Sequence, residues 1–198
     1  MRASIRKAIL IITVPALFII GIGQAMNYSA NRNIAAAHVE SELAKKDQEP
    51  LYRRFGGYAA DDVKRHWKLL GAEGRAAERH FLELDLIYPS FYGGLILGAM
   101  LVAWSYLGRP FSPTWLVVPV AVTVISDWTE NVIQLRQLEG YLASEHYVLD
   151  NSWIQMASLA TTTKLLFFCG SSIFLICLAF SVARQAEAEP PSEKPCDA

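Results

Sequence analysis

Three carboxylates and one ammonium lie inside stretches of the chain that are otherwise apolar. Asp127 and Glu130 belong to the run SDWTEN at 126–131, while Asp85 and Lys164 occur in two other apolar segments. A charged side chain in hydrocarbon costs roughly 2.5–3.5 kcal/mol on insertion scales, so such groups usually face a bundle interior or a functional site. The pattern therefore predicts a membrane protein with a buried polar site.

Helical spacing groups the polar residues of these segments onto shared faces. The three sets are Asp85, Tyr88 and Tyr92; Asp127, Glu130 and Asn131; and Thr161 and Lys164. At 1.5 Å per residue, Asp85 lies about 6 Å and Lys164 about 16 Å from the start of their segments. Asp127 lies about 18 Å from the start of its own segment, which enters the membrane from the opposite side. These depths predict that all three sets meet in one layer, on the side of the long first loop.

The charges of this layer do not cancel, because three carboxylates meet one ammonium. Lys164 with Asp127 or Asp85 is the natural pair, and the remaining carboxylates are expected to be protonated, hydrated or bound to something positive. Asn131, Tyr88 and Tyr92 can orient the carboxylates by hydrogen bonds. We therefore expect a site for a proton, a cation, or a polar group of a lipid or small molecule, serving transport or sensing.

Two other functions stay open. Intramembrane polar residues also hold helices together, at around 0.6 kcal/mol per hydrogen bond, so the chain could be an assembly subunit with a membrane protein partner. A membrane enzyme acting on lipid head groups would use a carboxylate as general base near Lys164. The catalytic motifs that would identify a common enzyme class are missing: no nucleophile elbow, P-loop, dinucleotide fingerprint or HExxH is present.

Cysteine and histidine patterns predict no cofactor, metal site or structural disulfide. The cysteines form no CxxC pair, and the histidines outside the apolar blocks are expected to be surface groups; these residues are Cys169, Cys177 and Cys196, and His66, His80 and His146.

Composition points to an all-α integral membrane protein. The chain is 53% hydrophobic and 19% charged, against about 45–50% and about 25% in soluble domains. Four apolar blocks reach the length of about 20 residues that a bilayer requires; they cover about 8–25, 81–107, 115–135 and 153–182. We expect one four-span bundle over residues 1–185 and a disordered tail at 186–198. A net charge of -1 without a basic stripe argues against a nucleic-acid partner.

The first block could be a cleaved signal peptide, but its small-residue site at 23–25 is poor, so we favour an uncleaved anchor. Arg2, Arg6 and Lys7 before the first span and Arg184 after the last favour both termini in the cytoplasm. A bacterial inner membrane, with the lipid bilayer as a partner, is the expected location.

The long first loop, residues 27–80, is predicted to be helical. Helices are expected over 31–46 and 61–70, the second with Val63, His66, Trp67 and Leu70 on one face. A turn at 71–74 precedes a new helix that starts near Arg75 and enters the second span. Trp67 and Leu70 are expected to cap the bundle or to dip into the membrane interface.

Two further features concern the spans themselves. Pro89 and Pro119 are expected to bend their helices and to make room beside the polar face. The GxxxG pair, Gly94 and Gly98, is expected to pack within the chain.

The order of these motifs resembles that of a group of small bacterial four-span membrane proteins of uncharacterised function. The matching elements are GxxGR at 71–75, Asp85 followed by YP at 88–89 and YG at 92–93, Pro119 followed by DxxEN at 127–131, and Lys164. The resemblance covers roughly residues 58 to 175. It implies a four-helix membrane bundle and brings no known reaction.

Overall fold

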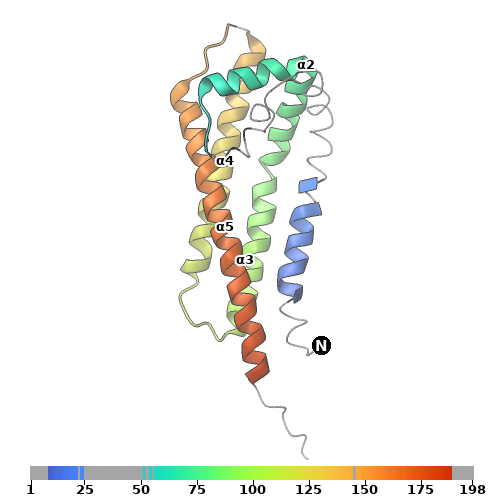
Figure 1. The fold of residues 1–198 in the computed structure, drawn as a ribbon, viewed down its shortest axis with the longest axis vertical. Coiled ribbons are helices and arrows are strands. Elements are labelled where there is room, and N and C mark those ends of the chain that lie inside the picture. Colours follow the sequence, from blue (N-terminus) through green and yellow to red (C-terminus); the bar gives the residue numbers. More distant parts are fainter. Residues whose placement is uncertain are drawn as a thin grey trace, which may run out of the picture.

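The computed structural model describes residues 9–21, 23–24, 51, 54, 56–144 and 146–188. Within these residues all regular secondary structure is helical. A short helix, Ile9–Gly21, is followed by α2 (Ala60–Asp85), α3 (Tyr88–Tyr106), α4 (Thr114–Ala143) and α5 (Asn151–Ala188) (Figure 1). The predicted all-α fold is therefore confirmed.

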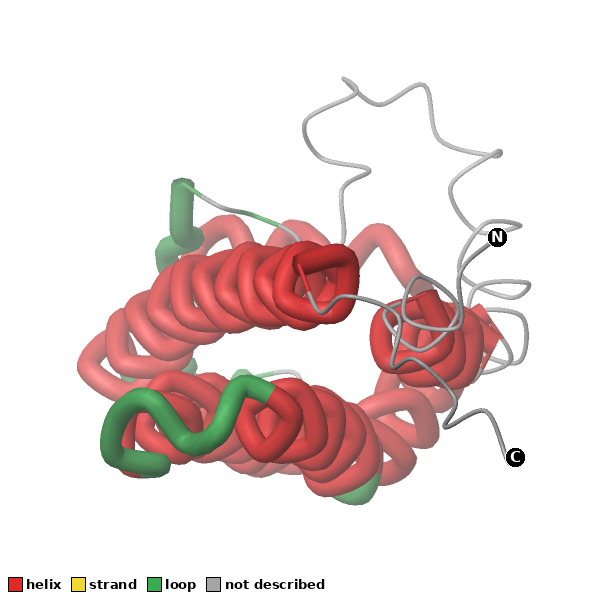
Figure 2. Tube along the Cα trace, turned by 90° about the horizontal axis from the view of Figure 1, so that it is seen from below, coloured by secondary structure: helices red, strands yellow, loops and turns green. Residues whose placement is uncertain are grey.

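The helices run side by side and alternate in direction. α3 descends, a turn at 107–113 leads into the ascending α4, and the segment 144–150 leads into the descending α5 (Figure 1). The short helix Ile9–Gly21 stands beside α3 (Figure 1), where the Tyr88 hydroxyl donates to the Ile19 carbonyl at 2.9 Å. Seen from below, the helices lie side by side around the axis of the bundle (Figure 2). Distant parts of the chain are thus brought together along one axis.

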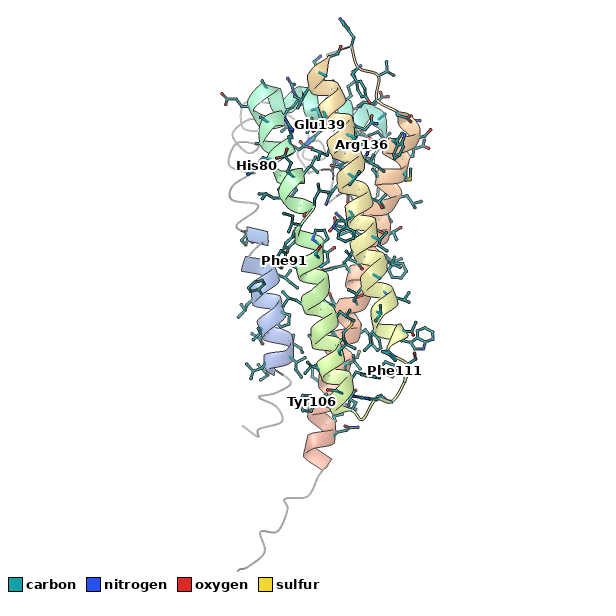
Figure 3. The ribbon with its side chains drawn as sticks, turned by 180° about the vertical axis from the view of Figure 1, so that it is seen from behind. His80, Phe91, Tyr106, Phe111, Arg136 and Glu139 are labelled. Atoms are coloured by element: carbon teal, nitrogen blue, oxygen red, sulfur yellow. The ribbon has the colours of Figure 1, made fainter. Side chains whose placement is uncertain are left out.

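Three helical stretches are long and apolar enough to cross a membrane: Ala60–Tyr106, Thr114–Ala143 and Asn151–Gln185. The apolar helix Ile9–Gly21 is shorter. At 1.5 Å per residue, the 30 residues of α4 span about 45 Å, more than the hydrocarbon thickness of about 30 Å. Figure 3 places Arg136, Glu139 and His80 near one end of the bundle. The charged end of α4, with Arg136 and Glu139, therefore lies at that end of the bundle.

α2 is bent at Gly71 and consists of two arms. Gly71 has φ 63° and ψ −171°, a conformation that favours glycine, and the helix resumes immediately after it. The first arm crosses one end of the bundle and the second descends along it (Figure 1). The predicted helix at 61–70 is confirmed, but the turn is confined to one residue instead of covering 71–74.

The first arm of α2 closes the end of the bundle with its apolar face. Val63 and Trp67 are fully buried, and Trp67 packs in a cluster with Leu138 and Ile154. The expectation that His66 is a surface group is wrong. His66 is only 3% exposed, because it shares that buried face, and its Nε2 lies 3.0 Å from Glu78 Oε2.

The apolar core has two clusters with a polar layer between them. One cluster lies at the α2 end and includes Trp67 and Leu138, and the other includes Ile96, Met100 and Leu116. On α4, Asp127, Glu130 and Asn131 lie between Val120 of one cluster and Ile133 of the other, and on α5 Lys164 lies between Ala157 and Leu175. The fold thus holds the polar layer away from both ends of the bundle.

Several boundaries and contacts differ from expectation. Gly94 and Gly98 face outward, and no atom of the described residues lies within 4 Å of the position that a Cβ would occupy on either, so the predicted internal packing of this pair is wrong. The helix α5 continues to Ala188, into the segment expected to be a tail. The predicted helix at 31–46 and the remaining tail at 189–198 lie outside the described residues.

Candidate functional site

The polar layer begins at a break in the backbone between α2 and α3. Pro89 has no N–H with which to bond the carbonyl of Asp85, four residues earlier. Asn131 Nδ2 donates to that carbonyl at 3.0 Å, and Trp128 Nε1 donates to the carbonyl of Leu86 at 2.9 Å. Because an unpaired carbonyl in an apolar layer is costly, two side chains of α4 stabilise the break.

Asn131 also connects two carboxylates. Its Nδ2 lies 3.1 Å from Asp85 Oδ2 and 3.4 Å from Asp127 Oδ1. Asn131 is 1% exposed, and its Oδ1 has no hydrogen-bond partner among the residues that the structure describes. The amide is therefore used fully as a donor and not as an acceptor.

Lys164 lies between the other two acidic side chains. Its Nζ is 2.7 Å from Asp127 Oδ1 and 2.6 Å from Glu130 Oε2. All three residues are buried, and Glu130 has no exposed surface. The expected pair of Lys164 with Asp127 is present, and Glu130 shares the same ammonium. Breaking a buried ion pair of this kind on one side leaves an uncompensated charge.

The two tyrosines of the predicted site differ in what they contact. The Tyr92 hydroxyl donates to Asp127 Oδ2 at 2.8 Å, as an orienting group should. The Tyr88 hydroxyl instead donates to the Ile19 carbonyl, so Tyr88 contacts the layer only through its ring, 5.3 Å from that of Tyr92. Of the predicted site residues, only Tyr88 directs its polar group away from the carboxylates.

Two residues that sequence reasoning did not include extend the network toward the α2 end. Gln134 Nε2 donates to Glu130 Oε1 at 2.9 Å and to the Tyr58 hydroxyl at 2.8 Å. Thr161 Oγ1 is 3.5 Å from the same hydroxyl. Burial raises the pKa of Tyr58 well above its ordinary value, so the phenol is neutral. Gln134 follows Glu130 by one helical turn and could have been found by spacing, whereas Tyr58 precedes α2 and carries no such signal.

The assembled network runs from Tyr58 through Gln134 and Glu130 to Lys164, and on through Asp127 and Asn131 to Asp85 at the break. It joins α2, α4 and α5, and the bond from Tyr92 to Asp127 adds α3 to the same buried layer, as the depth argument predicted. The network contains three carboxylates and one ammonium, which contacts two of them. Among the described residues, no group of three or more His, Cys, Asp or Glu side chains is arranged to hold a metal ion.

Comparison of the chain with protein-family models, with curated protein sequences and with solved structures gives no match.

Proposed function

We propose that the chain is a four-span protein of a bacterial inner membrane, with both termini in the cytoplasm, whose buried polar layer binds a proton or a small cation for transport or sensing. One observation carries the proposal: Asp85, Asp127 and Glu130 are each at most 7% exposed and have one ammonium, that of Lys164, among them. Buried charge without compensation is costly, so a positive ligand stabilises this layer.

The excess of negative charge is greatest at Asp85. Lys164 lies against Asp127 and Glu130, while Asp85 receives only the neutral amide of Asn131 in the contacts described above. The carboxylate also adjoins a break in a membrane-crossing segment, and broken helices are where transporters commonly form their ion sites. A positive ligand at this point both balances charge and contacts an element whose geometry can change.

Burial argues against larger ligands. A lipid head group or a substrate needs an open cavity beside Asp127, but Asp127 is 4% exposed and its two oxygens contact Lys164 and Tyr92. A head-group enzyme is therefore not part of the proposal. The alternative is that the polar layer only holds the helices together, and the following experiment distinguishes the two.

The test is thermal unfolding of the detergent-purified protein across pH and in lithium, sodium, potassium and choline salts. A ligand present at a hundred times its dissociation constant stabilises the native state by about 2.7 kcal/mol. We expect a pH- or cation-dependent shift that is lost in Asp85→Asn and kept in Asp61→Asn, which makes the same chemical change at an exposed position. Flat curves for all three proteins, with Asp85→Asn merely less stable, contradict the proposal and favour a packing role.

A further inference from the structure

The side-chain oxygen of Asn131 is a buried acceptor of this layer. Asn131 Oδ1 has no hydrogen-bond partner in the described part of the chain, although the residue is 1% exposed. The amide of Asn131 lies against both Asp85 and Asp127, with its Nδ2 directed at their oxygens. An ionised carboxylate accepts hydrogen bonds only, so neither neighbour can satisfy Oδ1 in this state.

A proton added to Asp85 supplies the missing donor. Protonation makes this carboxyl an O–H donor, and a half-turn of the Asn131 amide then presents Oδ1 to it. A proton also needs no cavity, whereas a metal ion does. The position between Asp127 and Glu130 is already taken by Lys164 Nζ, at 2.7 and 2.6 Å from their oxygens.

The same half-turn acts on the backbone break. Asn131 Nδ2 donates both to the side chain and to the main-chain carbonyl of Asp85. When Oδ1 replaces Nδ2 there, that carbonyl loses its donor, and Pro89 supplies none. The indole of Trp128, bound to the next carbonyl at Leu86, is then the side chain of α4 that still holds the break.

We propose that Asp85 is the proton-binding group of this membrane site, and that Asn131 transmits its protonation to the break between α2 and α3. This rests on the proposed function and names its ligand as the proton. The step is balanced: one proton adds to an Asp85 carboxylate oxygen, and hydrogen bonds alone are exchanged.

Within the described part of the chain, the titratable groups near Asp85 come from three helices. They are Asp127 and Glu130 of α4, Lys164 of α5, and Tyr88 and Tyr92 of α3. The short helix Ile9–Gly21 has no titratable side chain. Asp127 is a weaker candidate for the proton, because its oxygens already contact the Lys164 ammonium and the Tyr92 hydroxyl.

The experiment uses fluorine NMR of the full-length protein labelled with 5-fluorotryptophan. The chain has five tryptophans, and Trp128→Phe identifies the signal of Trp128. Spectra are recorded from about pH 4 to about pH 9, the range in which buried carboxyl groups titrate. We expect the Trp128 signal to shift with pH in the wild type, while that of Trp115, at the start of α4 and identified by Trp115→Phe, stays constant.

Asp85→Asn imitates the protonated side chain, because its amide N–H can donate to Asn131 Oδ1. In this variant the Trp128 signal should remain at its low-pH position throughout. If the Trp128 signal of Asp85→Asn shifts with pH as it does in the wild type, the inference is wrong. A flat Trp128 signal in a wild type whose thermal stability responds to pH overturns the inference alone, whereas flat results in both measurements remove the proposed function as well.

If Asp85→Asn does not fold, infrared difference spectra of the wild type serve instead. With ¹³C-labelled aspartate, and above about pH 6, where exposed aspartates are ionised, a carbonyl band of a protonated aspartic acid should be present, should be lost at higher pH, and should be retained in Asp127→Asn. Absence of the band, or its loss in Asp127→Asn, overturns the assignment to Asp85.

Discussion

Lys164 compensates two carboxylates at once, and its removal should cost more than the loss of either partner. Lys164→Met leaves Asp127 and Glu130 buried without a cation. Breaking a buried pair by removing one partner typically costs about 3–5 kcal/mol. We expect a loss of that size in the free energy of unfolding, measured by denaturant titration in detergent.

The matched control for this change is a charge-balanced double variant. Lys164→Met combined with Glu130→Gln should recover part of the lost stability, because one uncompensated carboxylate is removed with the ammonium. If Lys164→Met is as stable as the wild type, or if the double variant is less stable than Lys164→Met, the ion pairs do not stabilise the layer.

Asn131 should matter for a different reason, since it carries no charge. Asn131→Leu keeps a side chain of similar size but removes the donor to the Asp85 carbonyl and carboxylate. An unsatisfied buried acceptor costs about 1–3 kcal/mol, and unfolding titrations should show a loss in that range. Thr129→Ala, on the more exposed side of α4, removes only a bond to the Ile125 carbonyl and should stay within about 0.5 kcal/mol.

At the scale of elements, the break between α2 and α3 couples Pro89 to Asn131. Pro89→Ala supplies an N–H that can bond the Asp85 carbonyl, so the Asn131 donor becomes partly redundant there. A double-mutant cycle of Pro89→Ala and Asn131→Leu should therefore give a coupling energy of about 0.5–3 kcal/mol. Strictly additive losses would mean that Asn131 does not stabilise the break.

The bend of α2 depends on a single glycine. Gly71 has φ 63° and ψ −171°, a region that costs other residues about 1–3 kcal/mol. Gly71→Ala should lower the free energy of unfolding by that amount. Gly94→Ala is the control, because its helical position opens onto free space; it should leave stability unchanged or raise it by up to about 1 kcal/mol. Equal effects of the two changes would argue against strain at the bend.

At the scale of the whole molecule, periodicity predicted what lies on long helices. The i, i+3, i+4 spacing of Asp127, Glu130 and Asn131 and the depth of Lys164 were enough to place all four in one layer. The contacts that side chains of the layer make with backbone groups far away in the sequence could not be predicted. The carbonyl of Asp85 is bonded from 46 residues away, which follows from the packing of two helices and leaves no local pattern.

Histidine and tyrosine show the same limit from the other direction. His66 lies on the apolar face that the spacing identified, but its place outside the apolar blocks suggested a surface position. Its partner Glu78 belongs to the other arm of a bent helix, so the spacing did not indicate their contact. Tyr88 shares a face with Asp85, but the helix beside α3 offers its hydroxyl a carbonyl acceptor. In both cases the partner, and not the residue type, decides the orientation.

Tyr58 closes the polar layer from a segment that precedes α2. Its backbone N–H donates to Ser158 Oγ at 2.9 Å, and Gly57, at φ 77°, lies so close that a Cβ would meet the same oxygen at 2.6 Å. The Tyr58 hydroxyl accepts from Gln134, one step from Glu130. The non-helical segment 56–59 thus contacts the bundle through the site itself. The ionisation of the Tyr58 phenol should therefore change the free energy of unfolding.

Burial raises the pKa of Tyr58 in the folded protein above the ordinary value of about 10 that the unfolded chain retains. Above about pH 10 the unfolded state therefore binds fewer protons than the folded state, and stability falls as pH rises. We expect the difference in unfolding free energy between the wild type and Tyr58→Phe to be constant below about pH 10 and to shrink above it. Denaturant titrations at several alkaline pH values measure this difference, and the other tyrosines cancel because both proteins contain them. A difference that stays constant to the highest pH would show that the hydroxyl is accessible to solvent, and that segment 56–59 leaves the layer open at this end.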